Sequence, residues 1–312
     1  MRGFFSESEY KEISELYDLG AVSNVAYISE GFQTPKAIVS TARGKFVISK
    51  YTLSTKSVLG KSLESLAWEI DFLEHIKVLP VPHYVRSRSG AFLEQFGEFW
   101  VAVDTFIPGE HPKNITANIA EQLGEFVANL HILGQSFKET PPSRRRFYDL
   151  NPGVMLEMIE YASRQTNPAL LAVVEEVREG VEKYRLSDTL PKSFVHVDIK
   201  PENELFVGET LSAVIDFGNT YHDVMLLDVG KTIMWNCSKN RLLDAELQSA
   251  LLSGYQKKRA LTEDEIPLVR SAVLFAIYSH IWVDLYHTPL GYVPESYTKF
   301  LVDEFLPIAR SL

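Results

Sequence analysis

The stretch from Phe194 to Gly218 places two acidic residues and one amide at a spacing that constrains the whole chain. Asp198 lies in His-Val-Asp, Asn203 follows five positions later, and Asp216 opens the sequence Asp-Phe-Gly. A carboxylate in a fixed turn can orient an attacking hydroxyl and accept its proton. An amide and a second carboxylate are oxygen ligands that Mg²⁺ accepts, and Mg²⁺ neutralises the charge of ATP phosphates. The spacing therefore predicts a phosphoryl-transfer centre with Asp198 as the base and Asn203 and Asp216 as Mg²⁺ ligands.

Two further residues of this stretch receive different roles. The imidazole of His196 is expected to be structural, partly buried and bonded to the backbone of the loop. Lys200 follows Asp198 by two positions and is expected to reach the transferred phosphate as a point charge. The structural alternative for Asp198 is an Asx turn before Pro201, and for Lys200 it is a solvated loop position. Because the other members of the pattern are in register, the catalytic interpretation is favoured.

The apolar pattern changes along the chain from a strand-like to a helical period. Short apolar runs bounded by turn residues predict strands at residues 26–28, 37–40, 46–48 and 99–103. Helical spacing predicts helices at residues 62–77, 119–133 and 154–183, and from Asp228 to the C-terminus. Capping boxes at Ser6 with Glu9 and at Thr262 with Glu265 mark two further helix starts.

This order of elements predicts an α+β fold with two lobes. Residues 1–105 would form a small β-rich nucleotide-binding lobe, and residues 106–312 a larger, mainly helical lobe for catalysis and acceptor binding. The hinge is expected at residues 104–109, where Asp104 and Phe106 would line the nucleotide site.

The N-terminal lobe should also supply a lysine for the ATP phosphates and a glutamate that holds it. Glu69 lies on the helix expected to carry the glutamate. Strand alternation places Ser49, rather than a lysine, at the expected position. Lys50 would serve only if the strand is bulged or shifted, and Lys56 is the alternative. The loop around residues 30–34 would cover the nucleotide, although it contains no G-x-G-x-x-G.

The composition excludes several classes of protein. The chain has 312 residues, of which 46% are hydrophobic and 23% charged, as in a folded soluble protein. A net charge of −10 argues against general nucleic-acid or anionic-membrane binding. Cys237 is the only cysteine, which fits a reducing compartment. The N-terminal sequence turns acidic too early for a signal peptide, and no apolar run approaches transmembrane length. We therefore expect a cytoplasmic protein with no nucleic-acid or membrane partner, in an oligomeric state that the sequence leaves open.

With these motifs in place, the chain resembles the aminoglycoside phosphotransferase and choline kinase superfamily, and within it the type II homoserine kinases. The catalytic motifs H-x-D-x-x-x-x-N and I-D-F-G carry the resemblance to the superfamily, together with Leu-Asp-Val-Gly at residues 227–230. The resemblance to homoserine kinases covers nearly the whole chain, in the segments GFQTPKAIVSTARGKFVISKY, FIPGE, LGEFVANLHILGQSF, TIMWNC and SGYQKKRALTEDE and in the apolar helix ending at Tyr286. Lys200 and Ser49 depart from the pattern of the group.

The resemblance implies a protein-kinase-like bilobal fold and the use of ATP and Mg²⁺ to phosphorylate a hydroxyl of a small amino-bearing metabolite. Asp228 would hold the catalytic loop through hydrogen bonds. An acceptor with an ammonium group would suit carboxylates and aromatic faces in the large lobe. The candidates for this pocket are His222, Asp223, Trp235 and Asp284, with Asn236, Trp282 and Tyr286 near them in sequence.

Three alternatives remain open from the sequence. The acceptor could be homoserine, choline, ethanolamine, an aminoglycoside or another amino alcohol. The sequence Lys-Pro after Asp198 also admits an atypical protein serine/threonine kinase, although no A-P-E sequence follows Asp216. The missing lysine at Ser49 admits a nucleotide-binding module without activity.

Overall fold

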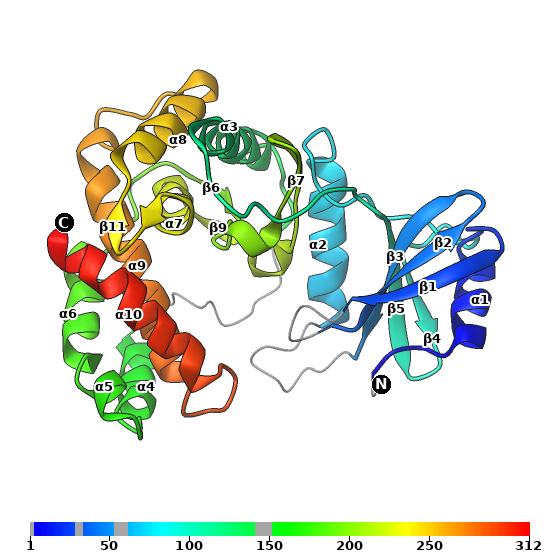
Figure 1. Ribbon diagram of the computed structural model, residues 1–312, viewed down its shortest axis with the longest axis horizontal. Helices are drawn as coiled ribbons and strands as arrows, with labels where there is room; N and C mark the ends of the chain where they lie inside the picture. Colours follow the sequence, from blue (N-terminus) through cyan, green and yellow to red (C-terminus); the bar gives the residue numbers. More distant parts are fainter. Residues whose placement is uncertain (1–2, 29–33, 53–61, 141–151) are drawn as a thin grey trace.

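A five-stranded antiparallel sheet lies beside a larger group of helices in the computed structural model (Figure 1). The structure describes residues 3–28, 34–52, 62–140 and 152–312. The strand order of the sheet is β1-β2-β3-β5-β4. Its strands are β1 (Val22–Ile28), β2 (Lys36–Thr41), β3 (Gly44–Tyr51), β4 (Leu93–Phe96) and β5 (Phe99–Thr105). The predicted α+β fold, with strands first and helices after them, is confirmed.

Alternation along the central strands gives the sheet two apolar faces, and a helix covers each. Ile48 of β3 and Val101 of β5 pack against α1 (Glu7–Leu16), which begins at the predicted Ser6 capping box. The opposite face carries Tyr51 of β3 and Ala102 of β5 and packs against α2 (Leu63–His75). We call these the α1 face and the α2 face of the sheet.

Helix α2 also packs against the helical part of the molecule. Its Trp68 and Phe72 rings stack 5.5 Å apart, and both lie against Phe194, with centroid distances of 5.4 and 5.1 Å. Phe72 also lies 6.4 Å from Phe217 of the Asp-Phe-Gly turn. Aromatic contacts at these distances fix relative orientation as well as burying apolar surface. Helix α2 therefore connects the sheet to the catalytic stretch, so its packing crosses the predicted lobe boundary at residue 105.

The helical part is arranged around α9 (Val269–His287), which contacts helices α4, α6, α7 and α10. The segment Ile266–His287 is long and apolar enough to cross a membrane, but 67% of that window is buried inside the protein. The other helices are α3 (Ala117–Gly134), α4 (Pro152–Ala162), α5 (Pro168–Leu171), α6 (Val174–Tyr184), α7 (Met225–Asn236), α8 (Ala245–Lys258) and α10 (Glu295–Ser311).

The expected long helix at residues 154–183 is divided into α4, α5 and α6. A new helix start causes the first break, because Asn167 caps α5 through its side chain and Pro168 occupies the first helical turn. Three short 3₁₀ helices complete the helical elements: η1 (Pro201–Asn203), η2 (Phe217–Asn219) and η3 (Ile266–Leu268).

Short two-stranded ribbons hold the catalytic stretch between the helices. Strand β6 (Lys192–Val195) pairs with β9 (Tyr221–Val224), and β7 (Glu204–Val207) pairs with β8 (Thr210–Val214). Strand β6 leads into Asp198, and the β7–β8 hairpin brings Asp216 back beside Asn203. The sequence did not predict β9, nor the small ribbon of β10 (Ser238–Lys239) and β11 (Leu242–Leu243) that interrupts the expected C-terminal helices.

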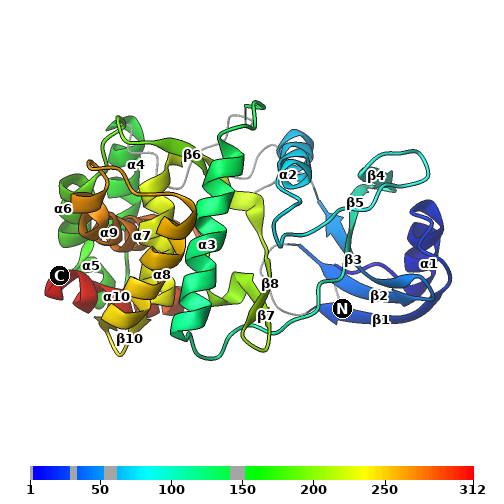
Figure 2. The same ribbon diagram turned by 90° about the horizontal axis from the view of Figure 1, so that it is seen from above.

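Helices α3 and α8 lie side by side in close contact (Figure 2). A Cβ atom added at Gly124 of α3 would overlap the carbonyl oxygen of Leu251 in α8. One added at Gly254 of α8 would overlap the carbonyl oxygen of Glu121 in α3. The two glycines allow the two backbones to approach each other, and this approach aligns His131 of α3 with Tyr255 of α8.

Candidate active site

The catalytic loop brings Asp198, Lys200 and Asn203 into direct contact. The ammonium of Lys200 lies 3.2 Å from Asp198 Oδ1. The Asn203 amide nitrogen donates to the backbone oxygen of Asp198 at 2.8 Å and to its Oδ2 at 3.2 Å. These bonds orient the Asp198 carboxylate and use only the nitrogen of the amide. Asn203 Oδ1 is then the atom that a metal ion would take, which fits the oxygen preference of Mg²⁺.

The turn that carries Asp216 is connected to this loop through the backbone. Ile215 N donates to Asn203 O at 2.9 Å, and Asp216 adopts a left-handed conformation with φ 64° and ψ 64°. His196 is fully buried; its Nδ1 accepts from Asp198 N at 3.3 Å, and its Nε2 then donates to Ile215 O at 3.1 Å. The predicted structural role of His196 is confirmed. The His196 imidazole therefore links the backbone of Asp198 to the turn that carries Asp216.

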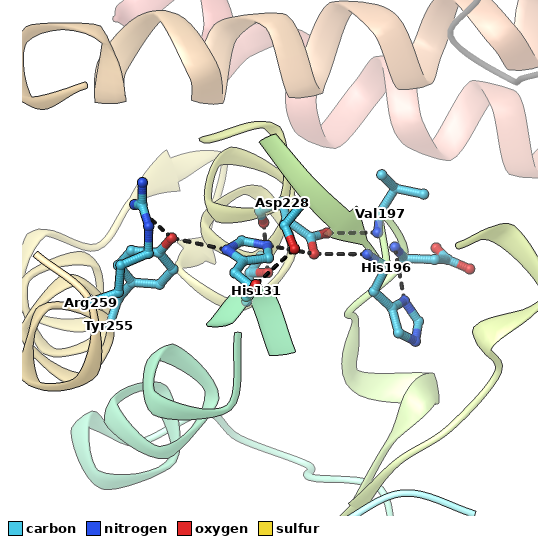
Figure 3. A network of polar contacts seen from close by, with 9 residues as sticks. His131, His196, Val197, Asp228, Tyr255 and Arg259 are labelled. Carbon is cyan, nitrogen blue, oxygen red and sulfur yellow. Dashed lines mark hydrogen bonds and ion pairs between the residues drawn. The ribbon is translucent and has the colours of Figure 1, made fainter. Parts of the chain in front are cut away.

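Asp228 holds the backbone just before Asp198, the predicted base (Figure 3). Its Oδ2 accepts from His196 N at 2.8 Å, and its Oδ1 accepts from Val197 N at 2.6 Å. Val197 has a φ of 61°, which is unfavourable for a β-branched residue. Paired bonds to a buried carboxylate offset that strain. The predicted role of Asp228 is confirmed, and the left-handed Val197 turns the chain so that Asp198 is presented from a fixed backbone.

Asp228 is itself held by a chain of polar contacts from α3 and α8 (Figure 3). Arg259 donates to the Tyr255 hydroxyl at 3.0 Å, Tyr255 lies 2.9 Å from His131 Nδ1, and His131 Nε2 lies 3.3 Å from Asp228 Oδ2. Because Arg259 donates to the Tyr255 oxygen, the Tyr255 hydroxyl proton is free to be donated to His131 Nδ1. His131 Nε2 then carries the ring proton and donates it to Asp228. Burial alone would raise the pKa of Asp228, but the hydrogen bonds from the His131 side chain and the His196 backbone hold it below its ordinary value. Asp228 is therefore an anion.

Opposing effects act on the charges of the catalytic loop. Burial raises the pKa of Asp198, the ammonium of Lys200 lowers it, and the nearby Asp216 raises it, with the net result above the ordinary value. Burial alone would lower the pKa of Lys200, but Asp198 raises it, so Lys200 stays charged. A carboxylate that is more basic than a free one is better suited to accept a proton.

Two of the predicted acceptor residues, Trp235 and Asp284, lie near this loop. The Lys200 ammonium lies 5.5 Å from the centre of the Trp235 ring. Asp284 is buried, and burial raises its pKa to about 7 against the charges of Lys231 and Lys200. Within the described part of the chain, Asp284 Oδ2 and Trp235 Nε1 are buried without a hydrogen-bond partner. An unmet acceptor and an unmet donor beside the base are suited to a small polar ligand.

A lysine, a histidine and a phenol near these residues were not predicted. Lys231 Nζ donates to Ala276 O at 3.1 Å and lies 3.1 Å from His280 Nδ1, and Tyr297 lies close enough to Lys200 to affect its pKa. The position of Lys231 could have been inferred from helical spacing. It lies three positions after Asp228 and four before Trp235, so the three residues share one face of a helix.

The other two acceptor candidates lie elsewhere. His222 is exposed and packs edge-on against Phe194, with ring centroids 5.4 Å apart. Asp223 lines a different pocket with Arg185 and Phe275. His222 and Asp223 are close to Asp216 in sequence, but strand β9 directs their side chains to places other than Asp198. The prediction for these two residues therefore differs from the structure.

The prediction for Lys50 does not agree with the structure. The β3 register is regular against both neighbouring strands from Phe46 to Tyr51, so the required bulge is absent from this described segment. Lys50 lies on the α1 face, where its ammonium contacts the Phe99 ring at 3.8 Å. Glu69 projects from α2 on the other side of the sheet and is buried. Lys56 and residues 30–33 of the predicted nucleotide loop lie outside the described residues.

The hinge residues lie where β5 leaves the sheet. Asp104 is half-buried and pairs with Val47 of β3, and burial raises its pKa to about 7 against the charge of Lys36. Phe106 N donates to Lys45 O at 3.0 Å, and the Lys45 ammonium lies 5.5 Å from the Phe106 ring. Both hinge residues therefore belong to the edge of the α2 face.

Comparisons with known proteins show which family the chain resembles over most of its length. The model of the family described as "Phosphotransferase enzyme family" matches residues 24–261. The chain is 26% identical over 256 residues to a homoserine kinase of Gluconobacter oxydans, covering 80% of this chain and 78% of that one. It is 28% identical over 284 residues to a homoserine kinase of Xanthobacter autotrophicus, covering 88% and 85%.

Two solved structures have a similar fold. Amicoumacin kinase hAmiN, in complex with AMP-PNP, Ca²⁺ and Ami, superposes with a TM-score of 0.72 at 13% identity, covering 99% of this chain and 94% of that one. A microcompartment-associated aminopropanol kinase gives a TM-score of 0.71 at 14% identity, covering 97% and 95%.

Proposed function

Because the chain belongs to the phosphotransferase enzyme family, we propose that it uses ATP and Mg²⁺ to phosphorylate the hydroxyl of an amino-bearing metabolite, with homoserine as the first candidate. The chain is a kinase with a small-molecule hydroxyl acceptor. The use of a nucleoside triphosphate with a divalent metal belongs to the proposal, and the complex of amicoumacin kinase hAmiN with AMP-PNP and Ca²⁺ supports it. The family match favours a small-molecule acceptor over the protein acceptor of the protein-kinase alternative. The single buried cysteine supports a cytoplasmic location as part of the proposal.

The geometry of the catalytic loop carries the proposal. Asp198 would accept a hydrogen bond from the acceptor hydroxyl and take its proton as the oxygen attacks the γ-phosphorus. Lys200, charged and 3.2 Å from Asp198, would balance negative charge on the phosphoryl group. Asn203 Oδ1 and the Asp216 carboxylate would hold the Mg²⁺. When bound, the ion neutralises the β- and γ-phosphate oxygens during transfer.

Two buried polar groups near Asp198 support an acceptor with an ammonium group. Asp284 Oδ2 is a buried acceptor without a partner in the described part of the chain, and Trp235 Nε1 is an unmet donor there. A ligand ammonium would satisfy Asp284 and favour its ionised form, and a ligand oxygen would satisfy Trp235.

An ADP-release assay across amino acids, amino alcohols and aminoglycosides tests the proposed reaction. We expect ADP release with homoserine above the rate without acceptor. The Asp198→Ala variant should lose about 1000-fold or more in kcat while its affinity for ATP is kept, because the base acts only on the acceptor. A variant with near-wild-type kcat would contradict the role of Asp198. No acceptor-dependent ADP release across the panel would contradict the proposed function.

The two predicted acceptor carboxylates allow a matched test of the pocket. Asp284→Asn should raise the KM of the acceptor about tenfold or more and leave the KM of ATP unchanged, because the proposal places Asp284 against the acceptor ammonium and not against the nucleotide. Asp223→Asn, in the other pocket, should leave both KM values unchanged. Equal effects of the two substitutions on the acceptor KM would show that the pocket is wrongly placed.

A further inference from the structure

The α2 face of the sheet has no lysine at the position where a kinase usually carries one. In protein kinases a lysine of the third strand contacts the α- and β-phosphates and pairs with a glutamate of the following helix. Ser49 occupies this position and is 1% exposed. The regular register of β3 keeps Lys50 on the α1 face, away from Glu69.

The neighbouring strand brings another lysine to the same place. Lys36 of β2 lies directly opposite Ser49 in the antiparallel pairing. Directly opposed residues share a face of the sheet, with Cα atoms about 5 Å apart. Lys36 is half-buried, and its four-carbon stem can carry the ammonium over the small Ser49 side chain.

The effect of Lys36 on Asp104 agrees with the face that the strand pairing gives. Asp104 is opposite Val47, and Ser49 is opposite Ala102, all on the α2 face. The charge of Lys36 lowers the pKa of Asp104 against the effect of burial, as expected for two side chains on one face of the sheet.

A second lysine on this face, Lys45, occupies a different place. It lies opposite Ser40 near the turn between β2 and β3, with its ammonium 5.5 Å from the Phe106 ring. This position is beside the hinge, where a nucleotide base is expected. Lys36 lies at the other end of β2, the end expected to face the phosphates.

We propose that Lys36 binds the α- and β-phosphates of ATP from strand β2, in place of the lysine that kinases carry in the third strand. The inference rests on the proposed function. Ser49 is then small and uncharged because a longer side chain would fill the space that the Lys36 stem crosses.

Nucleotide binding by the full chain, measured by calorimetry with MgATP and with adenosine, tests this assignment. Lys36→Met should bind MgATP about 10- to 100-fold more weakly, because it loses a charge-assisted contact to phosphate. The same variant should bind adenosine within roughly twofold of wild type, which shows that the fold and the base site are intact. Lys36→Arg should keep most of the MgATP affinity, because arginine also binds phosphate.

Lys50→Met is the matched control, one strand away on the opposite face, and should bind MgATP like wild type. The assignment is overturned if Lys36→Met binds MgATP within roughly twofold of wild type, or if Lys50→Met loses as much affinity as Lys36→Met. The two proposals fail differently. If wild type does not bind MgATP, the proposed function fails; if wild type binds and turns over ATP but Lys36→Met is unchanged, only the role of Lys36 fails.

Discussion

At the scale of single residues, the site depends on one fully buried anion, Asp228. Asp228 accepts bonds from His196 N, Val197 N and His131, and these bonds offset a left-handed valine. Asp228 is therefore a positioning residue, because it fixes the backbone from which Asp198 projects. Its two oxygens face donors only, so an amide cannot replace it without turning an N–H toward another N–H.

Asp228→Asn should separate positioning from folding. We expect the free energy of unfolding to fall by about 3 kcal/mol, because a buried donor loses its charged acceptor. The kcat should fall about 100-fold, with the ATP affinity little changed. Denaturant unfolding and steady-state kinetics measure the two effects. Asp303→Asn, in the exposed pair with Lys299, is the control and should change the free energy of unfolding by less than about 1 kcal/mol. Equal losses in the two variants would contradict the role of Asp228.

At the scale of elements, the crossing of α3 and α8 aligns the polar chain behind the catalytic loop. His131 comes from α3 and Tyr255 from α8, and the two side chains meet 2.9 Å apart only because the backbones approach at Gly124 and Gly254. Packing of backbone on backbone leaves no flexible side chain that could make room. A small change in this crossing is therefore transmitted to Asp228.

Gly254→Ala should force the two helices apart. The added methyl group overlaps the carbonyl oxygen of Glu121, so we expect a loss of about 2 to 3 kcal/mol in the free energy of unfolding. We also expect a lower kcat, because the His131–Asp228 bond lengthens. Ser249→Ala, exposed on the same helix, should leave both quantities unchanged. A gain in stability, as expected from the better helix propensity of alanine, would mean that the crossing can relax.

The sequence could predict those elements of the site whose contacts are local. Asp198, Asn203 and Asp216 lie within one stretch, and bonds between near neighbours fix them, so spacing was sufficient. The side of the sheet on which Lys50 lies also followed from alternation. The residue of β2 that lies opposite Ser49 was not predicted, because it depends on the exact hairpin turn, in which Thr41 pairs with Gly44. The His131–Tyr255 contact was not predicted because its partners lie 124 positions apart in the sequence.

At the scale of the whole molecule, buried carboxyl groups set how stability depends on pH. Burial raises the pKa of Glu204 from an ordinary 4.5 to about 8, and the pKa values of Asp104 and Asp284 to about 7. The folded protein therefore binds protons that the unfolded chain has released. Their contribution to stability is complete below about pH 4 and is lost as the pH rises through the folded pKa values.

These carboxyl groups should lower the free energy of unfolding as the pH rises from 5 to 8, whereas His280 and Lys231, whose pKa values burial lowers, act in the opposite direction. Glu204→Gln should flatten this slope and stabilise the protein at pH 8 by about 2 kcal/mol, because the amide stays neutral at the contact with Asn236. Glu202→Gln, next to it and outside the core, should keep most of the slope. Denaturant unfolding at several pH values measures both. A pH slope of Glu204→Gln equal to that of the wild type would contradict the burial of a neutral Glu204.

The double packing of α2 determines which part of the molecule can move. Its aromatic face, with Trp68 and Phe72, joins the large core of the helical part, whereas Leu66 and Ile70 join a small cluster on the sheet. A rotation that opens the nucleotide site must slide one of these two contacts, and sliding the smaller one exposes less apolar surface. Exchange of nucleotide would therefore move the sheet as a flap over α2, while the catalytic loop stays still.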